Sequence, residues 1–230
     1  MLDGKYTLCR NGKLCFISRD PAKMRFTVYN AGEYQISIPQ NVSACEVVLI
    51  GAGGSAGMGH FHKPDIFNTY WGTAGSGGGG AYIRKLFTKP ELENLSVLNL
   101  VVGAGVKTYR ANGGNTVLSS GSVTLTATGG TGGLDGQGDG GQTGEKGYGG
   151  IPSATPEGLS NLKMLNGNDG STGYYPTGGA GQAVYPGGAG FIINTKEYGR
   201  GGQNGGYGDY NINTTGAGHD GAAVVIFYEE

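Results

Sequence analysis

Runs of apolar residues, either continuous or alternating with polar ones, mark out β-strands along the first 128 residues. Residues 25–29 and 33–38 alternate, which is typical of half-buried strands, and residues 45–50 form an apolar run typical of a buried strand. Only residues 90–94 fit a helical turn. The pattern therefore predicts an all-β domain that a distant C-terminal strand completes. Its remaining strands are expected at 81–87, 97–102, 115–119, 122–127 and 222–228.

A short hairpin is predicted ahead of this domain. Strand-like residues 5–9 and 14–18 flank Asn11-Gly12, and such a dipeptide is a strong signal for a two-residue hairpin turn. We interpret residues 1–24 as a separate element that either docks the chain to a partner or caps the main domain.

A period of three residues runs through the glycine-rich stretch 129–150. In steps of three from Gly129 to Gly150, seven of the eight positions are glycine, and Asp135 is the exception. Three residues per turn is the geometry of a polyproline II helix, which would align these glycines on one face. Because glycine has no Cβ, another backbone can approach that face closely. Shorter runs with the same step lie at 51–57, 72–78 and 199–208.

We therefore expect a bundle of extended helices that hydrogen-bond to one another, since their backbone groups need partners. The bundle would comprise residues 129–219 with the loops 51–80 and 103–114. Residues 129–150 would form its first long helix, with Asp135 at an exposed edge or at a turn. A β-sandwich made of residues 25–128 and 220–230 would fix both ends of the insertion.

Composition and charge exclude several classes of protein. Fifty of 230 residues are glycine, but the charged fraction is only 14% and β-branched runs are clear, which argues against disorder. The formal net charge of -1, without a basic run, predicts no nucleic-acid partner. No signal peptide or membrane-spanning run is visible, so we expect a chain that is not membrane-embedded and not exported by a secretory signal. The odd number of cysteines predicts free thiols formed in a reducing cytoplasm, at Cys9, Cys15 and Cys45.

Motifs that suggest chemistry lack the context that the chemistry needs. Gly51-Ala-Gly-Gly-Ser-Ala56 follows a predicted strand like a dinucleotide-binding turn, but glycines and a proline interrupt the helix that should follow. Asp135–Asp139 resembles a calcium-binding glycine repeat without its apolar residue. Ser119 and Ser120 have no histidine nearby. We therefore expect neither an enzyme nor a cofactor.

The histidines at positions 60 and 62 leave two interpretations open. At this spacing they could share one face of a strand and hold a metal ion with a third ligand. Alternatively, they are exposed polar residues of a loop. The second interpretation is favoured because no carboxylate or cysteine lies at ligand spacing, so no metal site is predicted.

Aromatic residues gather in short islands between the glycine tracts. Tyrosine beside glycine, serine and asparagine is typical of binding loops, because it offers a large contact area at a low cost in side-chain entropy. These rings could instead cover the glycine faces and seal the bundle. We favour binding for the islands as a group. The candidate receptor-binding residues are Phe61, Phe67, Tyr70, Trp71, Tyr109, Tyr174, Tyr175, Tyr185, Tyr207 and Tyr210.

The order of several segments resembles that of glycine-rich phage tail-fibre domains, in particular the tip adhesins of T-even-like phages. The resemblance covers residues 26–230. It begins with residues 26–42, Glu46-Val-Val-Leu-Ile-Gly-Ala-Gly-Gly54 and Gly77-Gly-Gly-Gly-Ala81-Tyr-Ile-Arg-Lys. It continues with Leu100-Val-Val-Gly-Ala-Gly105, Gly113-Gly-Asn-Thr116 and Gly221-Ala-Ala-Val-Val-Ile-Phe. Residues 1–25 are short for the docking domain of such adhesins.

The resemblance implies a β-sandwich, of the jelly-roll or TNF-like kind, that carries a polyglycine II bundle with receptor-binding loops at its distal end. It also implies a place at the distal end of a virion's tail fibre, attached to a tail-fibre protein. The implied receptor is an outer-membrane protein or lipopolysaccharide of a Gram-negative host. Two alternatives remain: a structural virion cap or spacer without receptor binding, and an ice-binding polyglycine protein.

Overall fold

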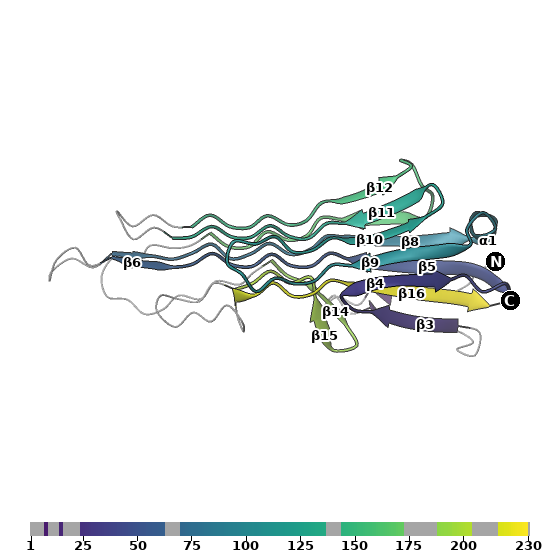
Figure 1. The fold of residues 1–230 in the computed structure, drawn as a ribbon, viewed down its shortest axis with the longest axis horizontal. Coiled ribbons are helices and arrows are strands. Elements are labelled where there is room, and N and C mark those ends of the chain that lie inside the picture. Colours follow the sequence, from purple (N-terminus) through teal and green to yellow (C-terminus); the bar gives the residue numbers. More distant parts are fainter. Residues whose placement is uncertain are drawn as a thin grey trace.

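The computed structural model of the chain describes residues 7–8, 14–15, 24–62, 70–136, 144–172, 188–203 and 216–229. Figure 1 shows two parts along one long axis, with β-sheets at one end and a bundle of extended tracts that continues from them toward the other end. The short strands β1 (Thr7–Leu8) and β2 (Leu14–Cys15) pair with each other, as the hairpin signal predicts.

Two five-stranded antiparallel sheets form the first part, and the predicted all-β fold is confirmed. The first sheet has the order β12 (Pro152–Thr155), β11 (Val123–Ala127), β10 (Thr116–Ser120), β9 (Val97–Val102) and β4 (Gly32–Ser37). The second has the order β13 (Leu162–Leu165), β8 (Tyr82–Thr88), β5 (Val42–Ile50), β16 (Ala222–Glu229) and β3 (Met24–Tyr29). The helical turn expected at 90–94 is α1 (Lys89–Leu92).

Four strands lie in a region where the sequence pattern indicated none. Besides β12 and β13, the hairpin β14 (Phe191–Ile193) and β15 (Lys196–Tyr198) falls within residues 129–219. Each of these strands has only three or four residues, too few to produce a clear alternation of apolar and polar positions.

The apolar core lies between the two sheets, and a second cluster covers the outer face of β5 and β16. Alternate residues of β5, such as Val47 and Leu49, point into the core, whereas Val48 and Ile50 belong to the outer cluster. The β14–β15 hairpin contributes Ile193 and Tyr198 to that cluster. Strand β5 is therefore covered on both faces, which confirms its prediction as a buried strand.

Eight extended tracts continue from the sheets into the bundle, and each is named here by a letter. Seven of them directly precede or follow a strand of the two five-stranded sheets, and tract G follows β15 of the β14–β15 hairpin (Figure 1). They are tract A (51–59), tract B (73–81), tract C (110–115), tract D (128–136), tract E (144–151), tract F (166–172), tract G (199–203) and tract H (216–221).

The register of the strand pairs persists along the bundle. Strands β5 and β8 are paired in the sheet, and tracts A and B keep the same register until the chain becomes strand again in β6 (His60–His62) and β7 (Tyr70–Gly72). The successive partners along this path are Ile50 with Tyr82, Gly51 with Ala81, Gly54 with Gly78, Gly57 with Gly75, and His60 with Gly72. The sheet therefore sets which residues meet in the bundle.

Successive residues of a tract donate their backbone N–H groups to three different neighbours in rotation, as a helix with three residues per turn requires. Tract A shows the rotation over seven consecutive residues. Gly51, Gly54 and Gly57 donate to tract B, Ala52 and Ser55 to tract C, and Gly53 and Ala56 to tract H, with N···O distances of 2.9–3.0 Å. This is the expected bundle of hydrogen-bonded three-residue helices.

Tracts that continue from opposite sheets bond directly to each other. Gly75, Gly78 and Ala81 of tract B, which leads into the second sheet, donate to tract D, which leaves the first sheet. Packed sheets usually stand about 10 Å apart because side chains fill the space between them. Here a Cβ on Gly130 would lie 2.1 Å from the carbonyl oxygen of Gly78, so no side chain fits. The two layers of the sandwich thus merge into one bundle.

Side-chain oxygens take the place of a neighbouring tract at several edges of the bundle. Asn115 and Asn112 accept hydrogen bonds from the N–H groups of Gly129 and Gly132, each at 3.0 Å. Asp169 accepts one from Gly149 at 3.0 Å. Because these N–H groups have a protein acceptor, the edge of the bundle does not offer them to another chain.

The sequence predicts one long helix over residues 129–150, and this prediction is wrong. Thr131 and Leu134 of tract D donate to Tyr148 and Glu145 of tract E, so the two tracts run antiparallel. The chain therefore reverses between residues 136 and 144. The three-residue glycine step continues across this reversal, which is why the sequence did not reveal it.

We expect Gly77→Ala to destabilise the protein by about 3 kcal/mol or more, because the overpacking is against rigid backbone. The new Cβ would lie 2.0 Å from the carbonyl oxygen of Gly54, and only a separation of tracts A and B would relieve the clash. The free energy of unfolding in urea measures the effect. Gly59→Ala is the control, because its Cβ would meet only one carbonyl, at 3.3 Å. Equal losses for both variants would contradict the packing argument.

Candidate binding surface

Among the described residues, the strand pair β6–β7 lies farthest from the sandwich (Figure 1). Its register sets Phe61 opposite Trp71 and His62 opposite Tyr70. Glycine gives way here to large residues, which do not fit between closely packed tracts, and the backbone returns to β pairing. Three candidate aromatic residues, Phe61, Tyr70 and Trp71, are thus brought together on one strand pair.

The other tracts also lead away from the sandwich and return. Within the described residues, tracts D, F and G run outward as far as residues 136, 172 and 203, and tracts E and H return from residues 144 and 216. The remaining candidate residues lie outside the described part of the chain, one between β6 and β7 and the others between residues 172 and 216. They are Phe67, Tyr174, Tyr175, Tyr185, Tyr207 and Tyr210.

Tyr109 lies on the flank of the bundle and not on the β6–β7 pair. Ser55 of tract A fixes the surrounding loop, because its hydroxyl donates to the Thr108 carbonyl at 2.5 Å and accepts from the Ala111 N–H at 2.9 Å. The Tyr109 side chain is half-buried. Burial first, and then the negative charge of Asp135, raise the pKa of its phenol. The ring is therefore only partly available to a ligand.

The sequence left two roles open for Asp135, an edge residue or a turn residue. In the structure it lies at the edge of tract D. One carboxylate oxygen accepts a hydrogen bond from the N–H of Met58 at 2.7 Å, and the other lies 3.3 Å from Arg110. Arg110 adopts a left-handed backbone conformation with φ of 61° beside Tyr109. The break in the glycine frame thus marks a charged contact that ties tract D to tract A and to the Tyr109 loop.

Tyr148 is an exposed aromatic residue that the sequence analysis did not select. It is 55% exposed on tract E, with the Lys146 ammonium 5.7 Å from its ring centroid. Lys146 also pairs with Asp169 at 2.8 Å. The hydrogen bond from the Lys146 ammonium, followed by the hydrogen bond from the Gly149 N–H, holds the pKa of Asp169 below its ordinary value. The three-residue glycine step could have indicated that Tyr148 is exposed. Gly144, Gly147 and Gly150 are buried, so the residues that follow each of them share an exposed face.

The described residues hold no group of three or more His, Cys, Asp or Glu side chains that could bind a metal ion. His60 and His62 do lie on one strand, β6. Residues 51–56, which resemble a dinucleotide-binding turn, enter tract A and do not begin a helix. None of the helices in the described ranges is long and apolar enough to cross a membrane.

The expectation of free thiols is met at Cys45, which is buried without a disulfide partner. Burial, and to a lesser extent the charge of Glu46, raise the pKa of this thiol to about 12. Such a thiol stays protonated near neutral pH and is a poor nucleophile. Cys9 lies outside the described residues, and Cys15 is described only as part of β2.

Comparison with known families gives one match. A family model described as a glycine-rich domain matches residues 27–228, which is nearly the whole span from β3 to β16. A comparison with curated proteins finds no match.

Asp135→Ala should expose the N–H of Met58 to hydrogen exchange, because the Asp135 carboxylate is its acceptor among the described residues. We expect exchange at Met58 to become faster by up to about tenfold, the value of one net hydrogen bond. Asp135→Asn retains an acceptor oxygen and serves as the matched control. Unchanged exchange at Met58 in Asp135→Ala, measured by NMR, would mean that this carboxylate does not secure the edge.

Proposed function

Because the chain belongs to the family of glycine-rich domains, we propose that its bundle presents receptor-binding loops and that the protein is a non-enzymatic adhesin at the tip of a phage tail fibre. The phage setting and the place at the fibre tip come from the resemblance of residues 26–230 to such adhesins. The receptor is an outer-membrane protein or lipopolysaccharide on a Gram-negative host.

The connectivity of the bundle is the observation that carries the proposal. Outgoing and returning tracts join in segments 63–69, 137–143, 173–187 and 204–215. Three of these segments contain candidate aromatic residues, and β6–β7 adds further ones at the far end of the bundle (Figure 1). A chain that gathers tyrosines between the outward ends of rigid supports has the composition and arrangement of a binding surface.

The hydrogen-bonded tracts also reduce the cost of binding. Ordering a flexible loop on its receptor consumes part of the interaction free energy, and a support that is already ordered avoids much of that loss. Tract A alone donates seven backbone hydrogen bonds, from Gly51 to Gly57. The ends of the loops are therefore held before the receptor arrives.

Attachment to the virion takes place at the opposite end. Strand β3 begins and β16 ends on the side of the sandwich away from the bundle, where Met24 pairs with Tyr228. A tail-fibre protein joined there, with residues 1–24 as the docking element, leaves the whole length of the bundle between the fibre and the host surface.

Binding of purified, labelled protein to a panel of Gram-negative bacterial cells, measured by flow cytometry, tests the proposal. Phe61→Ala with Trp71→Ala, and Tyr174→Ala with Tyr175→Ala, should each weaken binding about tenfold or more if they remove contact residues. Tyr148→Ala is the matched control, because this tyrosine is exposed on tract E, away from the loops. Thermal melting confirms that each variant is folded.

Three outcomes contradict the proposal. Unchanged binding by both double variants would reject the loops as the receptor site. A loss of binding in Tyr148→Ala alone would move the site to the flank of the bundle. If the wild-type protein binds no cell of the panel and does not compete with phage for adsorption, the protein is a structural cap or spacer.

A further inference from the structure

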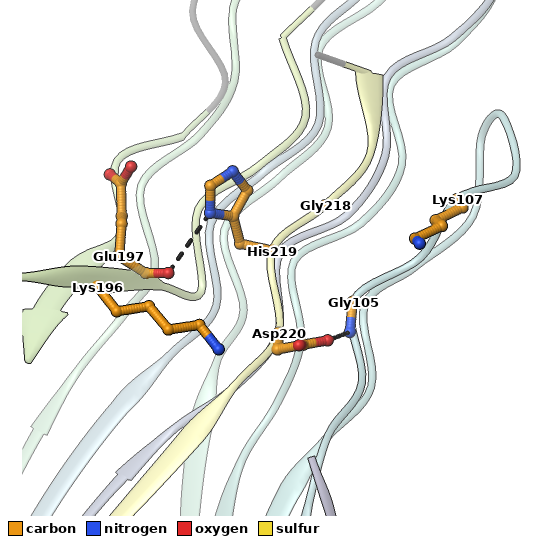
Figure 2. Close-up of a pocket in the computed structure, with 7 residues that line it drawn as sticks. All are labelled: Gly105, Lys107, Lys196, Glu197, Gly218, His219 and Asp220. Atoms are coloured by element: carbon orange, nitrogen blue, oxygen red, sulfur yellow. Dashed lines mark hydrogen bonds between the residues drawn. The ribbon is translucent and has the colours of Figure 1, made fainter. Parts of the chain in front are cut away.

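An open pocket of roughly 190 Å³ lies where the bundle meets the sandwich, beside the β14–β15 hairpin. Its floor is backbone of tract H and of the loop after β9, where Gly218 donates to the Val106 carbonyl at 3.0 Å. Gly218 has no room for a side chain, because a Cβ there would lie 1.9 Å from the Gly53 carbonyl oxygen. The floor is therefore rigid, and the chemistry of the pocket comes from the side chains on its walls (Figure 2).

Two lysines from different elements reach toward the middle of this pocket. Lys107 belongs to the loop after β9 and Lys196 begins β15, and Figure 2 shows the two lysines on opposite sides of Asp220 and Gly105. The exposed Lys196 ammonium also lies 4.8 Å from the ring centroid of Tyr198 and 3.4 Å from Asn30 Oδ1. Among the described residues, no carboxylate forms an ion pair with either lysine.

The acidic side chains of the pocket, Glu197 and Asp220, have partners other than the two lysines. Glu197 pairs with Arg200 at 3.1 Å, and Figure 2 shows its carboxylate turned away from the lysines. One oxygen of Asp220 accepts the N–H of Gly105 at 2.8 Å, so the carboxylate is held at the floor. His219 lies beside it, with Nδ1 3.4 Å from the Glu197 carbonyl oxygen. With the Glu197–Arg200 pair neutral, the two lysines outweigh Asp220 and the pocket is cationic.

We propose that this pocket binds a sugar that carries a phosphate or carboxylate group. The anion lies between the ammonium groups of Lys107 and Lys196, which are strong charged donors for its oxygens. Asp220 accepts a hydrogen bond from a sugar hydroxyl with its second oxygen. An inorganic anion satisfies only the lysines, whereas a neutral sugar satisfies only Asp220, so the pocket selects ligands that combine both groups.

This site is separate from the tip of the bundle. Asp220 lies at the level of Ala52 in tract A, and β6 begins eight residues farther along that tract. At about 3.1 Å per residue in an extended three-residue helix, the two sites are roughly 25 Å apart. The inference therefore does not rest on the adhesin function, and either can fail without the other.

NMR titration of the full chain tests the pocket, with the backbone amide signals of Gly105 and Gly218 as reporters. The probes are glucose 6-phosphate, glucuronate, inorganic phosphate and glucose. We expect saturable shifts with one or both of the acidic sugars, and these identify whether phosphate or carboxylate is preferred. Lys107→Ala and Lys196→Ala should each raise the Kd about tenfold or more, while Lys163→Ala, an exposed lysine on β13, should leave it unchanged.

The variant Asp220→Asn tests the recognition of the sugar hydroxyl separately from the recognition of the anion. The amide oxygen can still accept the Gly105 N–H, but the negative charge is lost, so inorganic phosphate should bind more tightly and the preference for the sugar should fall. Absence of saturable shifts with both acidic sugars would overturn the proposal. Inorganic phosphate binding as tightly as glucose 6-phosphate to the wild type would also overturn it, because sugar recognition would then be absent.

Discussion

The fold depends on the absence of Cβ atoms at the contacts between tracts. Two layers of a β-sandwich are normally separated by their side chains, and their backbones never meet. In this protein the layers converge until backbone N–H and C=O groups from opposite sheets bond to each other, as tracts B and D do. Where an added Cβ would meet the backbone of a neighbouring tract, as at Gly77 and Gly130, the approaching residue has to be glycine.

This arrangement exchanges one source of stability for another. The sandwich is held by buried aliphatic side chains such as Leu49, Leu100 and Leu118, whereas tract-to-tract contacts are hydrogen bonds between backbones. Each hydrogen bond contributes only about 0.5–1.5 kcal/mol, and ordering glycine is costly in entropy. The bundle can remain ordered because the strands of the sandwich fix one end of almost every tract and set its register.

The sequence predicted those parts of the structure in which one residue pattern has one meaning. Long apolar runs became β5, β8, β9 and β16, and the three-residue glycine step became tracts with three neighbours. The short strands β12 to β15 escaped notice, because three or four residues carry too little periodicity. The reversal between residues 136 and 144 escaped as well, since the glycine step does not change there.

The candidate site was predictable to a different degree at each position. The aromatic island around Phe61 and Trp71 was recognisable because it interrupts glycine, and its strand pair closes the end of the bundle. Tyr109 was selected on the same grounds, but the loop fixed by Ser55 holds it against the flank. Side-chain acceptors such as Asn112 and Asn115 could not be identified, because their role depends on which edge of the bundle lacks a neighbour.

The unbroken register from β5–β8 to β6–β7 restricts how this protein can change in length. One extra residue in a tract would turn every later N–H group by a third of a turn, toward the wrong neighbour. Three extra residues restore the direction, but only if the partner tract gains three as well. The reach of the molecule can therefore grow or shrink in steps of about 9 Å, made in several tracts together, while the sequences of the loops vary independently.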